Sequence, residues 1–326
     1  MADPVSVKRK ALLDGGGLSS DMIRRYGLIL ILLLAVIVLS IVSDTFLTFT
    51  NIMNVLRQVS INGILAVGMT LVILTGGIDL SIGSLMAVSA VVAASIVSES
   101  PSAAVVALIA GMLASGVLGG VSGTMSSRLN VAPFVATLAM MTIARGIALI
   151  YTNGRPIVVD SAAFKFLGQG YLGPVPFPVV VFVLVTALVG IVLYMTKFGR
   201  YIFAVGGNEN AARISGIRVG RVKIGVYVIN GVLSGLAGAL LASRISSGQP
   251  NSGLGYELDA IAAVVIGGTS LFGGRGSLLG TIVGVLIIGV INNGLNLLDV
   301  SSYWQQIIKG VIIAGAVILD QRAKKN

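Results

Sequence analysis

The feature that most constrains this chain is a succession of apolar segments, each near the ~20 residues that an α-helix needs to cross a bilayer. Charged residues make up only 10% of the chain, against about 25% in soluble domains, so they cannot cover a water-facing surface. The sequence therefore predicts an all-α, polytopic membrane protein with about ten crossings. The segments are expected at residues 27–46, 54–76, 81–98, 103–126, 131–152, 176–197, 222–244, 257–273, 277–298 and 303–320.

These segments divide the chain into an N-terminal cytoplasmic segment (1–26), a transmembrane domain (27–320) and a cytoplasmic tail (321–326). A cytoplasmic loop at 198–222 interrupts the transmembrane domain. The glycine-rich stretches around 76–83 and 245–277 are expected to be broken or re-entrant, since glycine is unfavourable inside a regular helix.

Basic residues predict the orientation, because cytoplasmic loops of membrane proteins carry an excess of Lys and Arg. With a cytoplasmic N-terminus and ten crossings, sixteen of the 22 basic residues fall inside and four outside, so both termini are expected in the cytoplasm. The inside set is Lys8, Arg9, Lys10, Arg24, Arg25, Arg128, the six basic residues of 197–223, Arg275, Arg322, Lys324 and Lys325. The outside set is Arg57, Arg155, Lys165 and Arg244. The net charge of +10 thus reflects orientation, and no nucleic-acid partner is expected.

Several kinds of chemistry are missing from the sequence. It contains no Cys and no His, so thiol catalysis and histidine metal sites are excluded, and no metal or cofactor is expected. It also has no Gly-Lys dipeptide and hence no phosphate-binding loop for ATP hydrolysis. Four ionisable residues lie in or beside apolar segments, mostly near their ends: Asp79, Arg145, Asp259 and Lys309. An ion-coupled carrier would keep such groups near mid-membrane, so this pattern favours energy supplied by another subunit. A self-powered carrier and a membrane-embedded enzyme remain the alternatives.

The basic insert GRYIFAVGGNENAARISGIRVGRVK (199–223) interrupts the apolar pattern. Asn208 is a favoured N-cap, Glu209 suits the positive end of a helix, and Gly216 can adopt the left-handed conformation that ends one. The insert is therefore expected to form a two-turn helix from Glu209 to Ser215. One interpretation is a loop that only fixes topology, and the other is a docking element for a cytoplasmic partner.

Four stretches carry a resemblance to the sugar-importer permeases of the ATP-binding-cassette (ABC) superfamily. They are ILAVGMTLVILTGGIDLSIGSLMA (64–87), GRYIFAVGGNENAARISGI (199–217), YELDAIAAVVIGGTSLFGGRGSLLGT (256–281) and NNGLNLLDVSSYWQQIIKG (292–310). The resemblance extends from about Thr45 to Leu319. It implies a permease subunit in the bacterial inner membrane that is not itself an enzyme. Within the family it favours D-ribose as the cargo, with another pentose, a hexose or a furanosyl signalling compound left open.

The resemblance also implies partners and site residues. The partners are a second copy of the chain, a cytoplasmic ATPase subunit with two nucleotide-binding domains, and a periplasmic or lipid-anchored sugar-binding protein. The segment 208–217 is implied to be the coupling helix that docks on the ATPase. The residues expected to couple are Gly206, Gly207, Asn208, Glu209, Ala212, Arg213 and Gly216. Arg155 and Lys165, in the longest predicted outer connection, are candidates for contact with the binding protein.

Polar residues inside the apolar segments are candidates for a translocation pathway. They are Asn62, Asp79, Asn230, Asn292, Asn293 and Asn296. Each also has a structural interpretation: Asp79 can cap the helix that follows it, and amides can tie helices together. Arg145 is expected either to pair with an acid or to extend toward the membrane surface.

Glycines four residues apart predict close helix packing within the chain. The pairs are Gly116/Gly120, Gly119/Gly123, Gly231/Gly235 and Gly280/Gly284. The related strings GGIDLSIGSLMA and GGTSLFGGRGSLLG hint at a duplicated half, as is common in transporters.

Overall fold

The structure is a computed structural model, and it describes residues 20–325 of the chain. Most of the expected N-terminal segment 1–26 and the last residue of the tail lie outside the described residues. The long helices are α2 (Ser20–Val42), α3 (Phe49–Leu74), α4 (Ile82–Glu99), α5 (Ala104–Arg128), α6 (Pro133–Thr152), α8 (Phe177–Met195), α11 (Val219–Ile245), α13 (Leu278–Leu297) and α14 (Ser302–Lys325). The shorter helices are α7 (Ala162–Gln169), α9 (Lys197–Gly207), α10 (Glu209–Ile214) and α12 (Tyr256–Ile266).

The predicted all-α membrane architecture is confirmed. Seven helices in the described part of the chain are long and apolar enough to cross a membrane: α3, α4, α5, α6, α8, α11 and α13. α2 contributes a further apolar stretch, Gly27–Val42, and α14 covers the last expected segment. Side chains start several of these helices, as Thr48 does by accepting a hydrogen bond from the backbone N–H of Asn51 at the start of α3.

One expected crossing differs from its prediction. The segment 257–273 is expected to be one of the ten spans, within a glycine-rich stretch expected to be broken, and α12 ends at Ile266 after only 11 residues. Gly267 and Gly268 follow, and Gly268 has a φ of +88° that L side chains rarely adopt. The chain leaves the helical conformation there because glycine permits that geometry without a steric cost.

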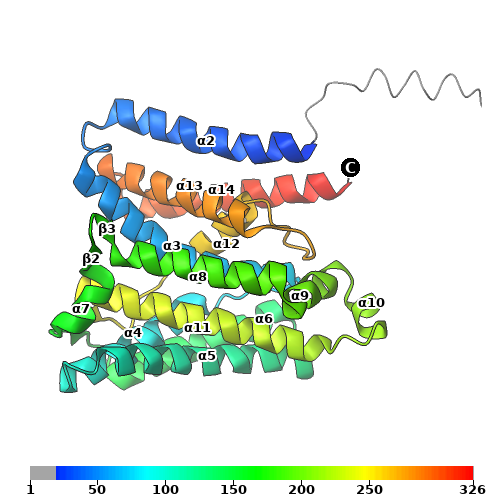
Figure 1. Cartoon of the computed structure of the whole chain (residues 1–326), viewed down its shortest axis with the longest axis horizontal. Coiled ribbons are helices and arrows are strands. Elements are labelled where there is room, and N and C mark those ends of the chain that lie inside the picture. Colours follow the sequence, from blue (N-terminus) through cyan, green and yellow to red (C-terminus); the bar gives the residue numbers. More distant parts are fainter. Residues whose placement is uncertain (1–19, 326) are drawn as a thin grey trace, which may run out of the picture.

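The two ends of the helical bundle carry different elements (Figure 1). The beginning of α2, the C-terminal end of α14, α9 and α10 all lie at one end, called here the α10 end. The opposite end, called the α7 end, carries α7 and the short strands β2 (Tyr171–Leu172) and β3 (Val175–Pro176), which pair with each other. A second pair joins β1 (Ile157–Val158) to β4 (Ser247–Gly248), far apart in sequence.

The core of the bundle is formed by α3, α4 and α11, with α5 packed against them. From Val59 to Leu74, every residue of α3 is buried. Glycine lets the helix backbones approach: a β-carbon at Gly119 of α5 would lie 2.5 Å from the carbonyl oxygen of Tyr227 in α11. A β-carbon at Gly231 would lie as close, 2.5 Å, to the carbonyl oxygen of Ser115. The predicted glycine faces therefore pack within the chain, as small residues do in membrane helix pairs.

Two non-helical segments separate helices of the bundle where the glycine-rich stretches predicted breaks. The non-helical segment 75–81 separates α3 from α4, and the largely non-helical segment 246–255 precedes α12. Gly248 lies against Ala90 and Ala94 of α4, whereas Gly253 meets Gly83 in the first turn of α4. The segment therefore runs along α4 for about 10–16 Å, given the 1.5 Å rise per helical residue. The first turns of α4 and α12 consequently lie close together.

Candidate functional site

α10 is a short helix with both ends closed by local hydrogen bonds. The side-chain oxygen of Asn208 accepts a hydrogen bond of 3.0 Å from the backbone N–H of Ala211. At the other end Gly216 has a φ of +82°, its N–H donates to the Arg213 carbonyl, and the N–H of Ile217 donates to the Ala212 carbonyl. This pair of bonds is the Schellman motif. The expected helix, its N-cap and its left-handed glycine are confirmed, with the last helical residue at Ile214 instead of Ser215.

Glu209 fixes α10 to the beginning of α11. Its carboxylate lies 2.6 Å from Nζ of Lys223 in α11 and 3.1 Å from the guanidinium of Arg213. The hydrogen bond from Lys223 is the main cause that lowers the pKa of Glu209 below its ordinary value. This carboxylate therefore stays ionised and keeps both cations in place at neutral pH.

Ala212 and Ile214 of α10 occupy opposite environments. Ala212 is 4% exposed and faces the protein, whereas Ile214 is 87% exposed. The sequence-based set contains Ala212 but omits Ile214. The available signal for Ile214 is that it is the one large apolar residue of α10, and an exposed side chain of this kind suits an interface core.

Gly206, in the last turn of α9, lies where α9 meets the end of α3 and the segment around Gly274. The N–H of Gly274 donates a hydrogen bond of 3.0 Å to the carbonyl of Leu74 at the end of α3. A β-carbon at Gly206 would collide with that carbonyl and would lie 2.6 Å from the Gly274 nitrogen. A β-carbon at the neighbouring Gly207 would meet nothing within 4 Å. Of these two neighbouring glycines of the expected coupling set, only Gly206 is required by close packing.

Asp79 anchors the non-helical segment before α4. Its carboxylate is completely buried and accepts hydrogen bonds from the backbone N–H and the hydroxyl of Ser81. It also accepts a 2.9 Å bond from the Asn230 amide in the middle of α11. The N-cap position of α4 is Ser81, so Asp79 acts two residues earlier than a standard N-cap. Two of the predicted pathway residues, Asp79 and Asn230, are therefore brought together.

A second buried carboxylate joins α12, α13 and α14. Asp259, in the first turn of α12, accepts a 2.9 Å hydrogen bond from Nζ of Lys309 and a 3.3 Å bond from the Asn292 amide. Asp259 is 6% exposed. A charged residue in an apolar span signals that a partner exists, but the sequence did not indicate that these two residues pair.

The remaining pathway candidates are spread over separate contacts. Asn293 and Asn51 exchange two amide hydrogen bonds of 2.8 and 3.0 Å, and Asn296 accepts a bond from Gln305. The side-chain oxygen of Asn62 is buried without a hydrogen-bond partner among the described residues. The six candidates thus do not converge on one cavity, and five of them tie helices or loops together.

The guanidinium group of Arg145 is hydrogen-bonded to backbone carbonyls. Its guanidinium donates hydrogen bonds of 2.6 and 2.8 Å to the carbonyls of Pro250 and Ser252. These two residues belong to the non-helical segment before α12, so Arg145 fixes α6 to it. Neither sequence-based alternative, an acid partner within ion-pair distance or extension to the surface, describes this arrangement.

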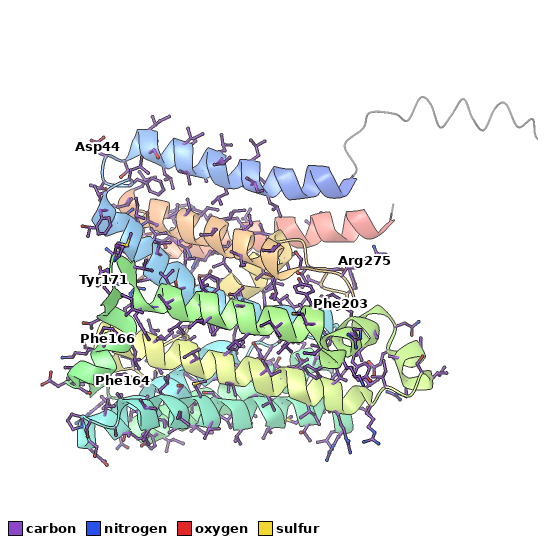
Figure 2. All side chains as sticks on the ribbon, in the orientation of Figure 1. Asp44, Phe164, Phe166, Tyr171, Phe203 and Arg275 are labelled. Atoms are coloured by element: carbon purple, nitrogen blue, oxygen red, sulfur yellow. The ribbon has the colours of Figure 1, made fainter. Side chains whose placement is uncertain are left out.

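Other basic residues are held at the α7 end. Arg57 lies 4.5 Å from the ring centroid of Tyr171 and donates to the carbonyl of Gln169. Figure 2 shows Tyr171 at this end together with the aromatic residues of α7. Lys165 forms a 2.8 Å ion pair with Asp160, and Arg155 is exposed in the same connection. Both docking candidates thus belong to the connection between α6 and α8, where Arg155 is exposed and Lys165 is half-buried and already paired.

Comparison with known proteins identifies the family. Residues 51–317 match the family described as branched-chain amino acid transport system / permease component. The chain is 53% identical over 304 residues to the ribose import permease protein of Bacillus subtilis, covering 92% of this chain and 94% of that protein. It is 48% identical over 295 residues to the ribose import permease protein of Escherichia coli K12, covering 89% and 92%.

A more distant relative is the L-arabinose transport system permease protein of Escherichia coli K12, with 37% identity over 305 residues and coverage of 93% of each protein. No solved structure matches the chain. The family match covers both non-helical segments, α10 and the buried polar contacts described above. The chain is thus a multi-pass membrane protein that belongs to this family of transport permease components.

Proposed function

We propose that this chain is the permease subunit of an ABC importer that carries D-ribose across the bacterial inner membrane. Two ribose import permeases, 53% and 48% identical over about nine-tenths of the chain, support the sugar assignment. ATP hydrolysis then belongs to a separate cytoplasmic subunit, and the chain itself is not an enzyme. Another pentose, a hexose or a furanosyl signalling compound is the alternative cargo.

The observation that carries the ABC assignment is the construction of α10. A helix of six residues is marginal alone, yet here it is capped at both ends and held by Glu209 to α11. An element that transmits movement from a neighbouring ATPase needs this stiffness. Gly206, at the end of α9 just before α10, packs directly against Leu74 and Gly274, next to the non-helical segment 75–81. The coupling set is therefore retained as Gly206, Gly207, Asn208, Glu209, Ala212, Arg213 and Gly216.

The same assignment sets the orientation and the partners. The α10 end faces the cytoplasm and contacts the ATPase, and both termini lie on that side. The α7 end faces the periplasm and receives sugar from a binding protein, with Arg155 and Lys165 guiding the encounter. Surface charges of this kind act mainly on association rate and register. A second copy of the chain completes the pore.

The translocation pathway is proposed to follow the two non-helical segments, 75–81 and 246–255. Broken helices at mid-membrane are a recurrent feature of transporter pathways. Asp79 and Asn230 lie at the first of them, and Asn292 contacts Asp259 at the second. Asn62, Asn293 and Asn296 are assigned to the same pathway, and the amides of the latter two bind other side chains.

Reconstitution with the partners tests this function. Proteoliposomes containing the permease, its ATPase and the binding protein should accumulate radiolabelled D-ribose only when ATP is present on the ATPase side. Excess unlabelled ribose should compete better than xylose, arabinose or galactose. Uptake that persists without the ATPase subunit would contradict the ABC assignment and indicate a self-powered carrier. Better competition by another sugar would correct the cargo alone.

Labelling from outside tests the orientation. Cysteines introduced at Asn326 and between residues 205 and 215 should resist a membrane-impermeant maleimide in intact spheroplasts and react after lysis. The native chain has no cysteine, so the background is low. Arg155→Cys is the matched control and should react in intact spheroplasts. Labelling of the α10 segment without lysis would overturn the proposed orientation.

A further inference from the structure

A cavity at the α10 end lies between the beginnings of α9 and α11, beside Gly216 of the proposed coupling set. Its volume is about 320 Å³, and its walls include Phe198, Tyr201, Arg218 and Arg221. We propose that this cavity binds the phosphate headgroup of an anionic phospholipid from the surrounding bilayer. This lipid site does not depend on which substrate the permease carries.

The first line of support is unneutralised charge. Within the basic stretch, Glu209 already binds Arg213 and Lys223. Arg218 and Arg221 are both exposed, and neither forms an ion pair among residues 20–325. Two guanidinium groups on one cavity wall match a phosphate, which arginine binds through several parallel hydrogen bonds. The cavity therefore has an excess of positive charge that the folded chain itself does not use.

The second line of support is the depth of the cavity relative to the membrane. α8 is an apolar crossing that ends at Met195, and Thr196 alone separates it from α9, which begins at Lys197. Figure 1 shows that α9 continues directly from α8 at the same end of the bundle as the beginning of α11. Tyr194 and Met195, in the last turn of α8, are 53% and 74% exposed. Phe198 and Tyr201 follow within two turns, at the level where aromatic residues meet lipid headgroups.

The third line of support is the apolar wall of the cavity, which Phe198 forms against α11. A β-carbon at Gly225 of α11 would lie only 3.1 Å from the ring of Phe198. Gly225 thus gives the Phe198 ring room to lie against α11 and to form the apolar side of the cavity. An apolar wall beside two arginines suits the glycerol ester region and phosphate of a lipid better than it suits a free inorganic ion. Basic pockets between transmembrane helices are known to bind anionic headgroups in this way.

Native mass spectrometry of the purified full chain, titrated with phosphatidylglycerol or with phosphatidylcholine, tests the proposal. The wild-type chain should bind phosphatidylglycerol in preference to phosphatidylcholine. The double variant Arg218→Gln/Arg221→Gln should bind phosphatidylglycerol roughly thirtyfold more weakly, since each basic residue near an anionic headgroup contributes about a fivefold factor. The matched control Arg128→Gln/Arg275→Gln removes two exposed cations outside the cavity and should change the affinity less than about fivefold. Figure 2 places Arg275 at the same end of the bundle.

Three outcomes would overturn the lipid site. The first is equal loss of affinity in the site and control variants, which would indicate general surface attraction. The second is displacement of the lipid by millimolar inorganic phosphate, which would indicate an ion site without lipid specificity. The third is unchanged lipid binding with loss of ATPase association, which would make the cavity part of the protein interface. If the double variant fails to fold, Arg221→Gln alone should show about a fivefold loss, and Arg221→Lys should restore most of it.

Discussion

Asn230 in α11 donates a 2.9 Å hydrogen bond to the buried carboxylate of Asp79, 151 positions earlier in the sequence. This bond connects the middle of the longest helix to the non-helical segment that begins the α4 crossing. The position of that segment therefore depends on a contact between distant parts of the chain.

Removing this bond should destabilise the protein. Asn230→Ala leaves a fully buried carboxylate without one of its partners, and the loss of a buried hydrogen-bond partner costs about 1–3 kcal/mol. The thermal midpoint of the purified protein in detergent should fall accordingly. Asn62→Ala is the matched control, because the Asn62 side-chain oxygen is buried without a hydrogen-bond partner among the described residues. Equal destabilisation by both substitutions would show that the Asp79 contact is not special.

Breaking the ion pair between Lys309 and Asp259 should cost more. Lys309→Met leaves the Asp259 carboxylate buried with only the Asn292 amide beside it, and uncompensated buried charges cost about 3–5 kcal/mol. Adding Asp259→Asn to Lys309→Met should recover part of the lost stability, since it removes the unpaired charge. A double-mutant cycle on the unfolding midpoints measures this coupling. Simple additivity of the two single effects would contradict a direct interaction.

The ion pairs of Glu209 predict a pH dependence for the order of α10. The pKa of Glu209 is lowered mainly by the hydrogen bond from Lys223. The stabilisation is therefore complete above the unfolded-state pKa of about 4.3, and it is lost as the pH falls through the lower folded-state pKa. Amide hydrogen exchange of residues 209–214, corrected for the intrinsic pH effect, should remain protected at pH 5.

A substitution of the partner lysine tests that dependence. Lys223→Met should move the loss of protection to higher pH, because Glu209 loses the main cause of its lowered pKa. Lys197→Met removes an exposed lysine at the same end of the bundle and should leave the profile unchanged. A profile that is the same in all three proteins would mean that the ion pair does not order α10.

The two neighbouring glycines at the base of α10 should differ in their tolerance. Gly206→Ala places a methyl group against the Leu74 carbonyl and the Gly274 nitrogen, so α9 or the segment around Gly274 must shift. Gly207→Ala meets open space. ATP-driven sugar uptake in proteoliposomes should fall more than tenfold for Gly206→Ala and less than twofold for Gly207→Ala. Similar uptake by the two variants would remove Gly206 from the coupling set.

The caps of α10 should affect coupling without affecting membrane insertion. Gly216→Val forces a β-branched residue into the left-handed region, where such residues are outliers, and Asn208→Ala removes a cap worth about 0.5–2 kcal/mol. Both variants should reach normal abundance, copurify poorly with the ATPase and lose uptake, with Gly216→Val the more severe. Full ATPase assembly and full uptake in Gly216→Val would leave α10 as a topology signal only.

Local features were predictable from the sequence. Asn208, Glu209 and Gly216 specify α10 because capping depends on residues a few positions apart. The apolar segments likewise predicted the long helices, since crossing a bilayer requires a minimum run of apolar residues. The fold class and the packing faces formed by glycine pairs followed from the same reasoning.

Long-range pairings were not predictable. Arg145 binds the backbone carbonyls of Pro250 and Ser252. Every residue has a backbone carbonyl, so the sequence could not indicate this pairing, and it led instead to the expectation of an acid partner. The pairing of Lys309 with Asp259 joins residues 50 positions apart, and nothing in the local sequence specifies it. The expected span 257–273 is longer than α12, because a hydropathy average includes the glycines that end the helix.

The shortness of α12 has a consequence for biogenesis. Its 11 residues extend about 16 Å, well short of the ~30 Å hydrocarbon core. Non-helical backbone at membrane depth is tolerated only where protein covers it, so this crossing cannot partition into lipid as an independent hairpin while the chain emerges from the ribosome. Gly253 packs against α4, and Gly267 packs against α13. The segment must therefore remain shielded until both of these helices lie beside it. Synthesis of α13 therefore completes the insertion of the segment before it, and a chain truncated ahead of α13 would expose an unfinished crossing to membrane quality control.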